Sequence, residues 1–289
     1  MSWFIFAFGA AILTAAAAIV EKKVLQKEHA MEFSAALALI NLVLAIPFLF
    51  FANFSSLTPI ILFLLFGASI LGSVAYLLVA KSTRHMEVSV VGPLMIFSPA
   101  ITSLLAFLIL GEALTQLQLS GIILMLIGSY VLEAQKHKIL EPIRIFVRSK
   151  YVHFIFAALI LYGLGSVIDR TLLSRYHVDI ITYLGIIHIF IAFIFSIMIF
   201  LFHDGFKGIA HGFRTSGWWI VLVAILTVGY RTAQITAMTT AYTGLVIAIK
   251  RMSSLFTVVI GGELFHEGEL LKKTLATIVM IVGAVLIAW

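Results

Sequence analysis

The chain contains ten long apolar segments that fall into two groups of five. A membrane-spanning helix needs about 20 apolar residues, so ten of them would use about 200 of the 289 residues and leave no room for a separate soluble domain. Segments such as 60–80 are apolar on every face, which indicates helices and not the alternating strands of a membrane barrel. The sequence predicts an all-α integral membrane protein with spans at 3–20, 33–52, 58–80, 88–110, 116–134, 151–173, 180–202, 216–241, 244–262 and 270–288.

The composition excludes a soluble domain, because 62% of the residues are hydrophobic and only 11% are charged, where soluble chains carry about 25% charged residues. The absence of cysteine excludes disulfides and thiolate metal sites. The formal charge of +6 is explained by basic loops that contact lipid head groups, so we expect the bilayer and no nucleic acid as partner. We interpret the apolar start of the chain as a retained first span in the cell membrane.

The two groups of five spans share short motifs at matching places. Residues 21–25 (EKKVL) correspond to 169–173 (DRTLL), and the Gly-Glu pair at 111–112 corresponds to the pair at 262–263. Because five is odd, a second repeat must enter the membrane from the opposite side to the first. The sequence predicts two inverted five-helix repeats: 1–135, then a basic linker at 136–150, then 151–289.

The distribution of Lys and Arg gives an orientation. These residues concentrate in the loops that follow odd-numbered spans, including the linker. The positive-inside rule then places those loops in the cytoplasm and both termini outside.

Arg231 is the most informative single residue, since it lies near the middle of the eighth predicted span. A charge there costs roughly 2.5–3.5 kcal/mol on insertion scales and should face the protein interior or water. Thr227, Arg231 and Gln234 share one helical face, which predicts a stripe that contacts a ligand. The alternative is an internal salt bridge that fixes helix packing.

Lys250 and Arg251 are adjacent cations about two turns into the ninth span, and Ser254 continues the Lys250 face. A substrate phosphate or carboxylate would satisfy them. The alternative is that both extend to the head groups. In the third span, Tyr76 shares a face with two serines and could border the same cavity.

Two carboxylates, Asp169 and its repeat counterpart Glu21, each lie beside a basic residue near the end of a span. Acid next to base could act as a gate or a proton site, or could be an interfacial ion pair. His188, at mid-span in the seventh helix, is a weaker candidate for coupling, because a lone buried histidine is more often neutral and hydrogen-bonded.

The chain resembles the drug/metabolite transporter superfamily, in particular the EamA-type ten-helix carriers. The resemblance covers nearly the whole length and depends on residues 91–94 (VGPL), 98–99 (SP), 110–112 (LGE), 250–251 (KR) and 262–263 (GE). It implies secondary transport by alternating access, with a central cavity between the repeats. The Lys250–Arg251 pair also looks like the pair that sugar-phosphate translocators of this superfamily use on substrate phosphate. The family's termini are usually cytoplasmic, which disagrees with the charge count.

We expect a transporter of a small organic, anionic metabolite, because the deep cations outnumber the deep carboxylates Glu21 and Asp169. The deep cations are Lys22, Arg170, Arg231, Lys250 and Arg251. Its further partner would be a coupling proton or a counter-substrate, and no cofactor is expected. Enzyme motifs are missing, and the spacing of His203, Asp204 and His211 matches no known metal site, which favours a solvated loop. The alternatives are an exporter of apolar or cationic compounds, and a membrane enzyme or scaffold without transport.

Overall fold

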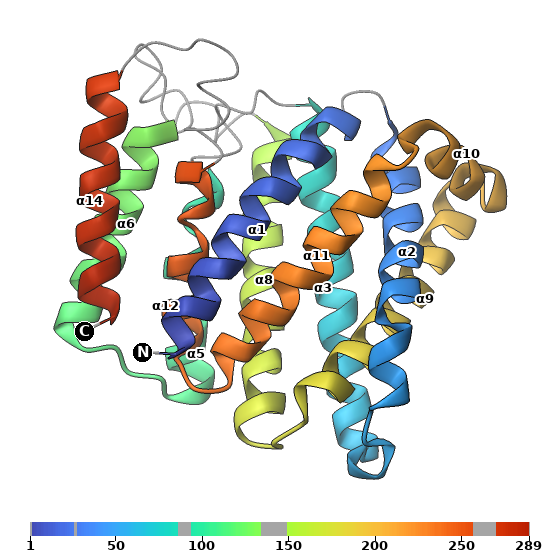
Figure 1. Cartoon of the computed structure of the whole chain (residues 1–289), viewed down its shortest axis with the longest axis horizontal. Coiled ribbons are helices and arrows are strands. Elements are labelled where there is room, and N and C mark those ends of the chain that lie inside the picture. Colours follow the sequence, from blue (N-terminus) through green and yellow to red (C-terminus); the bar gives the residue numbers. More distant parts are fainter. Residues whose placement is uncertain (1, 26–27, 86–93, 134–148, 257–269, 289) are drawn as a thin grey trace.

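The computed structural model describes residues 2–25, 28–85, 94–133, 149–256 and 270–288, which form a bundle of helices (Figure 1). The helices are α1 (Ser2–Leu25), α2 (Ala30–Phe50), α3 (Pro59–His85), α5 (Ser98–Leu110), α6 (Gln116–Glu133), α8 (Lys150–Ser174), α9 (Ile180–Phe202), α10 (Phe206–Ser216), α11 (Trp219–Met238), α12 (Thr243–Lys250) and α14 (Leu270–Ala288). One short 3₁₀ helix, η1 (Phe54–Ser56), joins α2 to α3.

Six of the described helices are long and apolar enough to cross a membrane: α1, α2, α3, α8, α9 and α11. Three others are apolar but shorter, at Ser98–Leu110, Gln116–Val131 and Ile278–Ile287. Every predicted span therefore contains a helix, but length and composition identify six of them as membrane-capable. The Gly-Pro pair at 92–93, part of the VGPL motif, lies outside the described residues. Within the same predicted span, the described chain turns at 96–97, just before α5.

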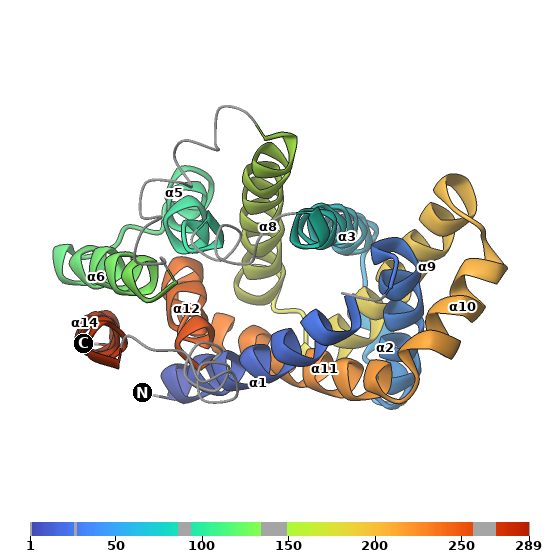
Figure 2. The same cartoon turned by 90° about the horizontal axis from the view of Figure 1, so that it is seen from above.

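Eight helices form a closed ring in which each contacts the next, in the order α1, α11, α2, α9, α3, α8, α5, α12 and back to α1. Seen from above, α1 and α11 face α3 and α8 across the ring (Figure 2). Of the three other α-helices, α6 and α14 pack together outside the ring beside α12, and α10 packs on α2. The order of contacts is the same when each helix is replaced by the helix at the same position in the other half: α1 by α8, α2 by α9, α3 by α11 and α5 by α12. The contact α1·α11 then becomes α8·α3, and α1·α12 becomes α8·α5.

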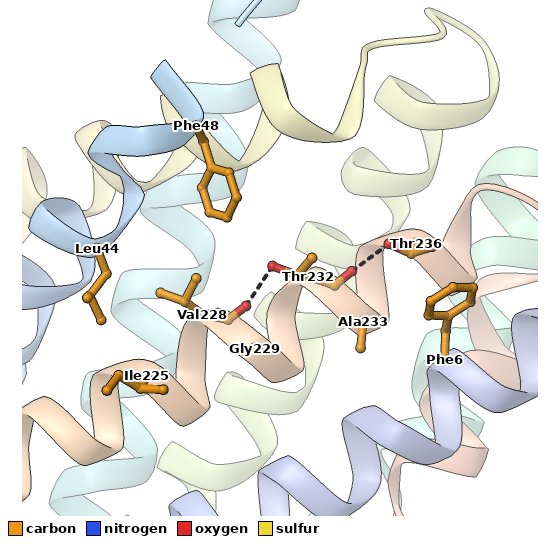
Figure 3. A pocket seen from close by; sticks show the side chains of 9 residues that line it. All are labelled: Phe6, Leu44, Phe48, Ile225, Val228, Gly229, Thr232, Ala233 and Thr236. Atoms are coloured by element: carbon orange, nitrogen blue, oxygen red, sulfur yellow. Dashed lines mark hydrogen bonds between the residues drawn. The ribbon is translucent and has the colours of Figure 1, made fainter. Parts of the chain in front are cut away.

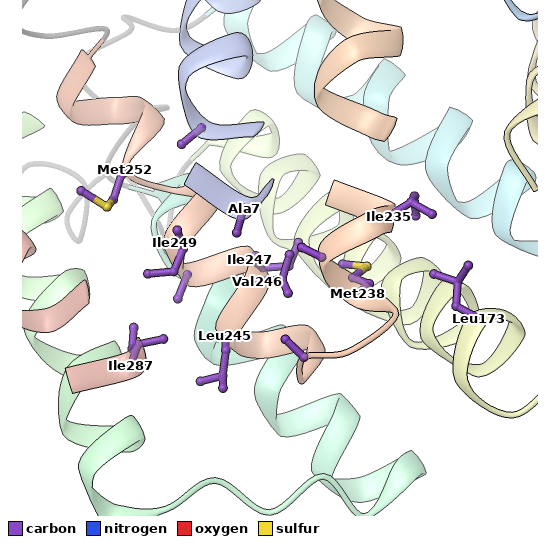
Figure 4. Packing of buried hydrophobic residues seen from close by; sticks show 14 of the residues in the cluster. Ala7, Leu173, Ile235, Met238, Leu245, Val246, Ile247, Ile249, Met252 and Ile287 are labelled. Atoms are coloured by element: carbon purple, nitrogen blue, oxygen red, sulfur yellow. The ribbon is translucent and has the colours of Figure 1, made fainter. Parts of the chain in front are cut away.

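Small residues allow close helix contacts in this bundle, as expected in lipid. On α1, which packs against α11, Ala7, Ala11 and Ala15 are buried, whereas Ala18 is exposed. The short helix α12 is buried along its length, and its side chains Leu245, Val246 and Ile249 belong to the largest apolar core (Figure 4).

The α6–α14 pair depends on glycine. A Cβ atom at Gly121 would lie 2.7 Å from the backbone oxygen of Gly283, and one at Gly283 would lie 2.7 Å from the oxygen of Gly121. We expect Gly121→Ala to separate the two helices and to destabilise the protein by about 1–3 kcal/mol, because backbone atoms cannot move aside cheaply. The matched control is Gly72→Ala, whose Cβ meets nothing within 4 Å. Melting in detergent would measure both; an equal effect of the two substitutions would contradict this account.

Candidate functional site

Two polar bridges cross the interior of the ring, and each contains one of the two predicted gating acids. In the first, the Tyr76 hydroxyl of α3 donates to Oε1 of Glu21 on α1, at 2.6 Å. Because α1 and α3 lie on opposite sides of the ring, this hydrogen bond spans its interior (Figure 2).

The second bridge joins three helices. Nη2 of Arg231 on α11 lies 3.2 Å from the hydroxyl of Tyr183 on α9, and that hydroxyl donates to Oδ1 of Asp169 on α8, at 2.6 Å. Tyr183 is fully buried and Asp169 is 6% exposed. The tyrosine hydroxyl therefore connects the predicted ligand-binding arginine to the predicted gating carboxylate.

The two acids, Glu21 on α1 and Asp169 on α8, are the pair that the predicted repeat relates, whereas Tyr76 on α3 and Tyr183 on α9 are not related in this way. The two bridges lie at different levels of the bundle. Glu21 is near the C-terminal end of α1, and Asp169 is near the C-terminal end of α8. These two ends are at opposite faces of the molecule (Figure 1).

Lys250 is the last residue of α12 and is held by neutral groups. Its Nζ donates to Oε1 of Gln234 at 2.6 Å and lies 4.4 Å from the centre of the Tyr230 ring. No carboxylate of the described residues lies within 4.0 Å of this ammonium group. The carbonyl end of a helix favours a cation, which helps to stabilise Lys250 and the capping residue Arg251 at this place.

The other predicted site residues have less specific positions. Arg251 is partly buried, and its backbone oxygen accepts a hydrogen bond from the Ser254 hydroxyl at 3.1 Å. His188 is buried, and its Nδ1 lies 2.7 Å from the carbonyl oxygen of Leu184 in its own helix.

Arg170, which the sequence interpretation counted among the deep cations of the cavity, is paired. Its Nε lies 2.9 Å from Oε1 of Glu112, and its Nη1 contacts the carbonyl oxygen of Met238. The other oxygen of Glu112 accepts from the backbone N–H of Thr243, at 3.0 Å. Glu112 follows Gly111, which ends α5 with a φ of 71°. This carboxylate therefore joins α5, α8 and the start of α12, while its predicted counterpart Glu263 lies outside the described residues.

Sequence reasoning missed two tyrosines of the site, Tyr183 and Tyr230. Both lie within apolar helices, where a phenol buries its ring and still needs a polar partner. Tyr230 is also the neighbour of Arg231 in the chain. A search for tyrosine within the spans would have found both.

An apolar pocket of about 460 Å³ lies on the opposite face of α11 from Arg231. It is formed by α1, α2 and α11 (Figure 3) and is lined by Phe6, Leu44, Phe48, Ile225, Val228, Gly229, Thr232, Ala233 and Thr236. The hydroxyls of Thr232 and Thr236 bond to carbonyl oxygens of their own helix, at Val228 and Thr232. The pocket therefore offers few free polar groups.

The chain is similar to known proteins in sequence over its first 133 residues and in fold over nearly its whole length. Residues 1–133 match the EamA-like transporter family. No curated protein matches the chain. A solved structure described only as the crystal structure of a protein has the same fold, with a TM-score of 0.74 at 14% identity, covering 99% of this chain and 96% of the other. The six apolar helices indicate a multi-pass membrane protein, and the family match over the first 133 residues agrees with this.

Proposed function

We propose that the protein is a secondary transporter that moves a small organic anion across the cell membrane by alternating access. The observation that carries this proposal is the Lys250 ammonium group inside the bundle, whose described partners are an amide oxygen and an aromatic ring. A buried cation without a carboxylate partner is expensive. A bound phosphate or carboxylate would compensate it.

The charges around this position favour an anion. Among the described residues, Glu21 accepts from Tyr76 and Asp169 accepts from Tyr183, and neither carboxylate is a partner of Lys250. The Lys250 ammonium group would therefore attract an anion.

Buried polar atoms without a hydrogen-bond partner among the described residues add support. They are Nε of Arg231, the hydroxyl of Ser73 on the Tyr76 face of α3, and the hydroxyl of Thr14 on the Glu21 face of α1. Each such atom costs about 1–3 kcal/mol unless water or a ligand satisfies it. Their places favour a wet interior between the two bridges.

In this mechanism the two bridges act as gates. Breaking the Glu21–Tyr76 contact would open one end of the interior, and breaking the Asp169–Tyr183–Arg231 contact would open the other. Binding of the anion by Arg231 would compete with the second bridge. Both acids could also take up a coupling proton, while His188 is a weaker candidate because it is bonded within its own helix.

We also propose the two inverted five-helix repeats, 1–135 and 151–289, with ten crossings in total. The exchange-symmetric order of the ring supports this division. The family match supports it too, because it ends at residue 133, near the proposed repeat boundary. The first residue of α1 and the last of α14 lie at the same face, as an even number of crossings requires (Figure 1).

The apolar pocket on α11 favours a second candidate, an exporter of apolar or cationic compounds. Phe6 and Phe48 would bind such a compound from the lipid side. The two candidates differ in what competes for the site: organic anions should inhibit the first transporter, and lipophilic cations the second.

The test uses the purified full chain. A thermal-shift screen against phosphorylated, carboxylate and cationic metabolites identifies a ligand class, since a ligand that binds the folded state raises the melting temperature. Uptake of the best radiolabelled ligand into liposomes, with and without an imposed proton gradient, then measures transport and coupling. Binding and uptake limited to cations or apolar compounds would reject the anion proposal.

Lys250→Gln should raise the KM for the anion by about ten- to a hundredfold, because a charge-assisted hydrogen bond contributes about 1.5–3 kcal/mol. The matched control is Lys207→Gln, an exposed lysine on α10, which should transport like the parent. Initial uptake rates over a range of concentrations give both constants. An unchanged KM in Lys250→Gln would remove this residue from the binding site.

A further inference from the structure

Two acidic and two histidine side chains meet where α2 begins and α9 ends. We name this group the His–Glu cluster: Glu28 in the turn before α2, Glu32 in the first turn of α2, His203 at the end of α9, and His211 on α10. The proposed transport mechanism does not use this cluster. The sequence interpretation expected a solvated loop around the two histidines, but the structure brings them against carboxylates of the first half.

Glu32 lies between the two histidines. Its Oε2 is 2.8 Å from Nδ1 of His211, and its Oε1 is 3.1 Å from Nε2 of His203. Oε2 of Glu28 is 3.9 Å from the same nitrogen of His211. Bonds of about 2.0–2.2 Å to one zinc ion would place neighbouring ligand atoms roughly 3.3 Å apart. The distance from Glu32 to His211, 2.8 Å, is shorter than this value, and the distance from Glu28 to His211, 3.9 Å, is longer.

Hydrogen bonding alone leaves this cluster unsatisfied. Oε2 of Glu28 is buried in a residue that is 5% exposed, and it has no hydrogen-bond partner among the described residues. A metal ion would satisfy this oxygen, because Glu28, Glu32 and His211 each offer a ligand atom within 4.8 Å of the others.

The packing of α10 fixes the cluster. A Cβ atom at Gly212 would lie 2.7 Å from the backbone oxygen of Glu32, and one at Gly208 would lie 3.4 Å from Cγ of Glu32. These glycines let α10 rest directly on the start of α2. Gly205, with a φ of 57°, permits the sharp turn from α9 into α10. His211 is therefore carried to the two glutamates by the fold and not by a flexible loop.

We propose that the His–Glu cluster binds a divalent transition metal, with Zn²⁺ as the preferred ion. Imidazole nitrogens with carboxylate oxygens suit zinc, and no thiolate is needed. Glu28, Glu32 and His211 are the ligands, and His203 lies 3.1 Å from the other oxygen of Glu32, where it orients that carboxylate. The ion ties α10 of the second half to the start of α2 in the first.

The exposure of His211 and the negative charge of the two buried glutamates both favour a bound cation. The His211 side chain is 58% exposed, so an ion can reach the cluster from the aqueous side. The two glutamates are largely buried and are compensated by a cation more effectively than by neutral imidazoles. A second group, formed by Glu32, His203 and the exposed Asp204, offers a further carboxylate beside the same site.

Zinc binding to the full-length protein tests the proposal. The protein is purified in detergent with a tag that lacks histidine, treated with EDTA, and titrated with Zn²⁺ against a chromophoric chelator. We expect about one ion per chain. His211→Ala and Glu28→Gln should each weaken binding at least about tenfold, since loss even of an outer partner of a metal ligand costs 10–100-fold.

The control variant is His153→Ala, which removes an exposed histidine at the start of α8 and should bind zinc like the parent. A second readout is stability: Zn²⁺ should raise the melting temperature of the parent and of His153→Ala, but not of His211→Ala. If Glu28→Gln does not fold, the zinc affinity of His211→Ala still tests the proposal, because His211 is exposed and its replacement should not affect folding. A parent protein that binds no zinc, or equal affinity in all variants, would reduce the cluster to ion pairs and overturn the proposal.

Discussion

The Arg231→Ala protein should lose transport, with uptake into liposomes at least about thirtyfold below that of the parent. Removing one partner of a buried, hydrogen-bonded charge pair costs about 2–5 kcal/mol, and each 1.4 kcal/mol is a factor of ten. Arg231 has two tasks in the proposed mechanism: it binds the anion, and through Tyr183 it holds Asp169. Both are lost with the guanidinium group.

Two further variants separate these tasks. Tyr183→Phe removes only the hydroxyl that connects Arg231 to Asp169, so anion binding should remain while the turnover rate changes. Arg175→Ala removes an exposed arginine at the end of α8 and should leave uptake unchanged. Melting curves would show whether each variant is folded. Uptake by a folded Arg231→Ala protein at the parent's rate would remove the arginine from the transport site.

Glu112→Gln should produce the largest loss of stability, about 3–5 kcal/mol, because it breaks a buried ion pair and leaves Arg170 uncompensated. Glu112 and Arg170 side chains are 8% and 13% exposed, so water can replace the lost partner only in part. The same carboxylate also accepts from the backbone N–H of Thr243. The start of α12 should therefore loosen as well.

The melting temperature in detergent measures this effect. The control is Asp179→Asn, which also removes one negative charge but keeps the N-terminal cap of α9, since Asn caps a helix about as well as Asp. Replacing Glu112 and Arg170 together by methionine should recover part of the loss, because no unpaired charge remains. A Glu112→Gln protein as stable as the control would show that the pair contributes nothing measurable.

The helical architecture could be predicted because apolar length is a local property of the sequence. Each of the ten predicted spans contains a helix in the described part of the chain. The helix α10 was missed because its 11 residues include Lys207, His211 and Arg214 and form no long apolar run. Phe206, Ile209 and Phe213 do recur at helical spacing and could have indicated an amphipathic surface helix.

The candidate site was predictable in its charged members but not in its pairing. Arg231 and Asp169 stand out because charge within an apolar span is costly. Their connection through Tyr183 depends on how α8, α9 and α11 meet, which no local pattern encodes. For the same reason, Arg170 was counted as a free cation although Glu112, 58 residues earlier, neutralises it.

The helix α10 makes the two halves unequal. Between α2 and α3 the chain forms only the short η1, whereas the corresponding connection between α9 and α11 contains α10, which packs on α2. In a carrier whose two equal halves exchange conformations, the states open to the two aqueous sides would have the same free energy. Because α10 packs on α2 with no equivalent in the other half, the two states should differ in free energy. The solute-free protein should then populate one state more than the other and bind solute at different rates from the two compartments.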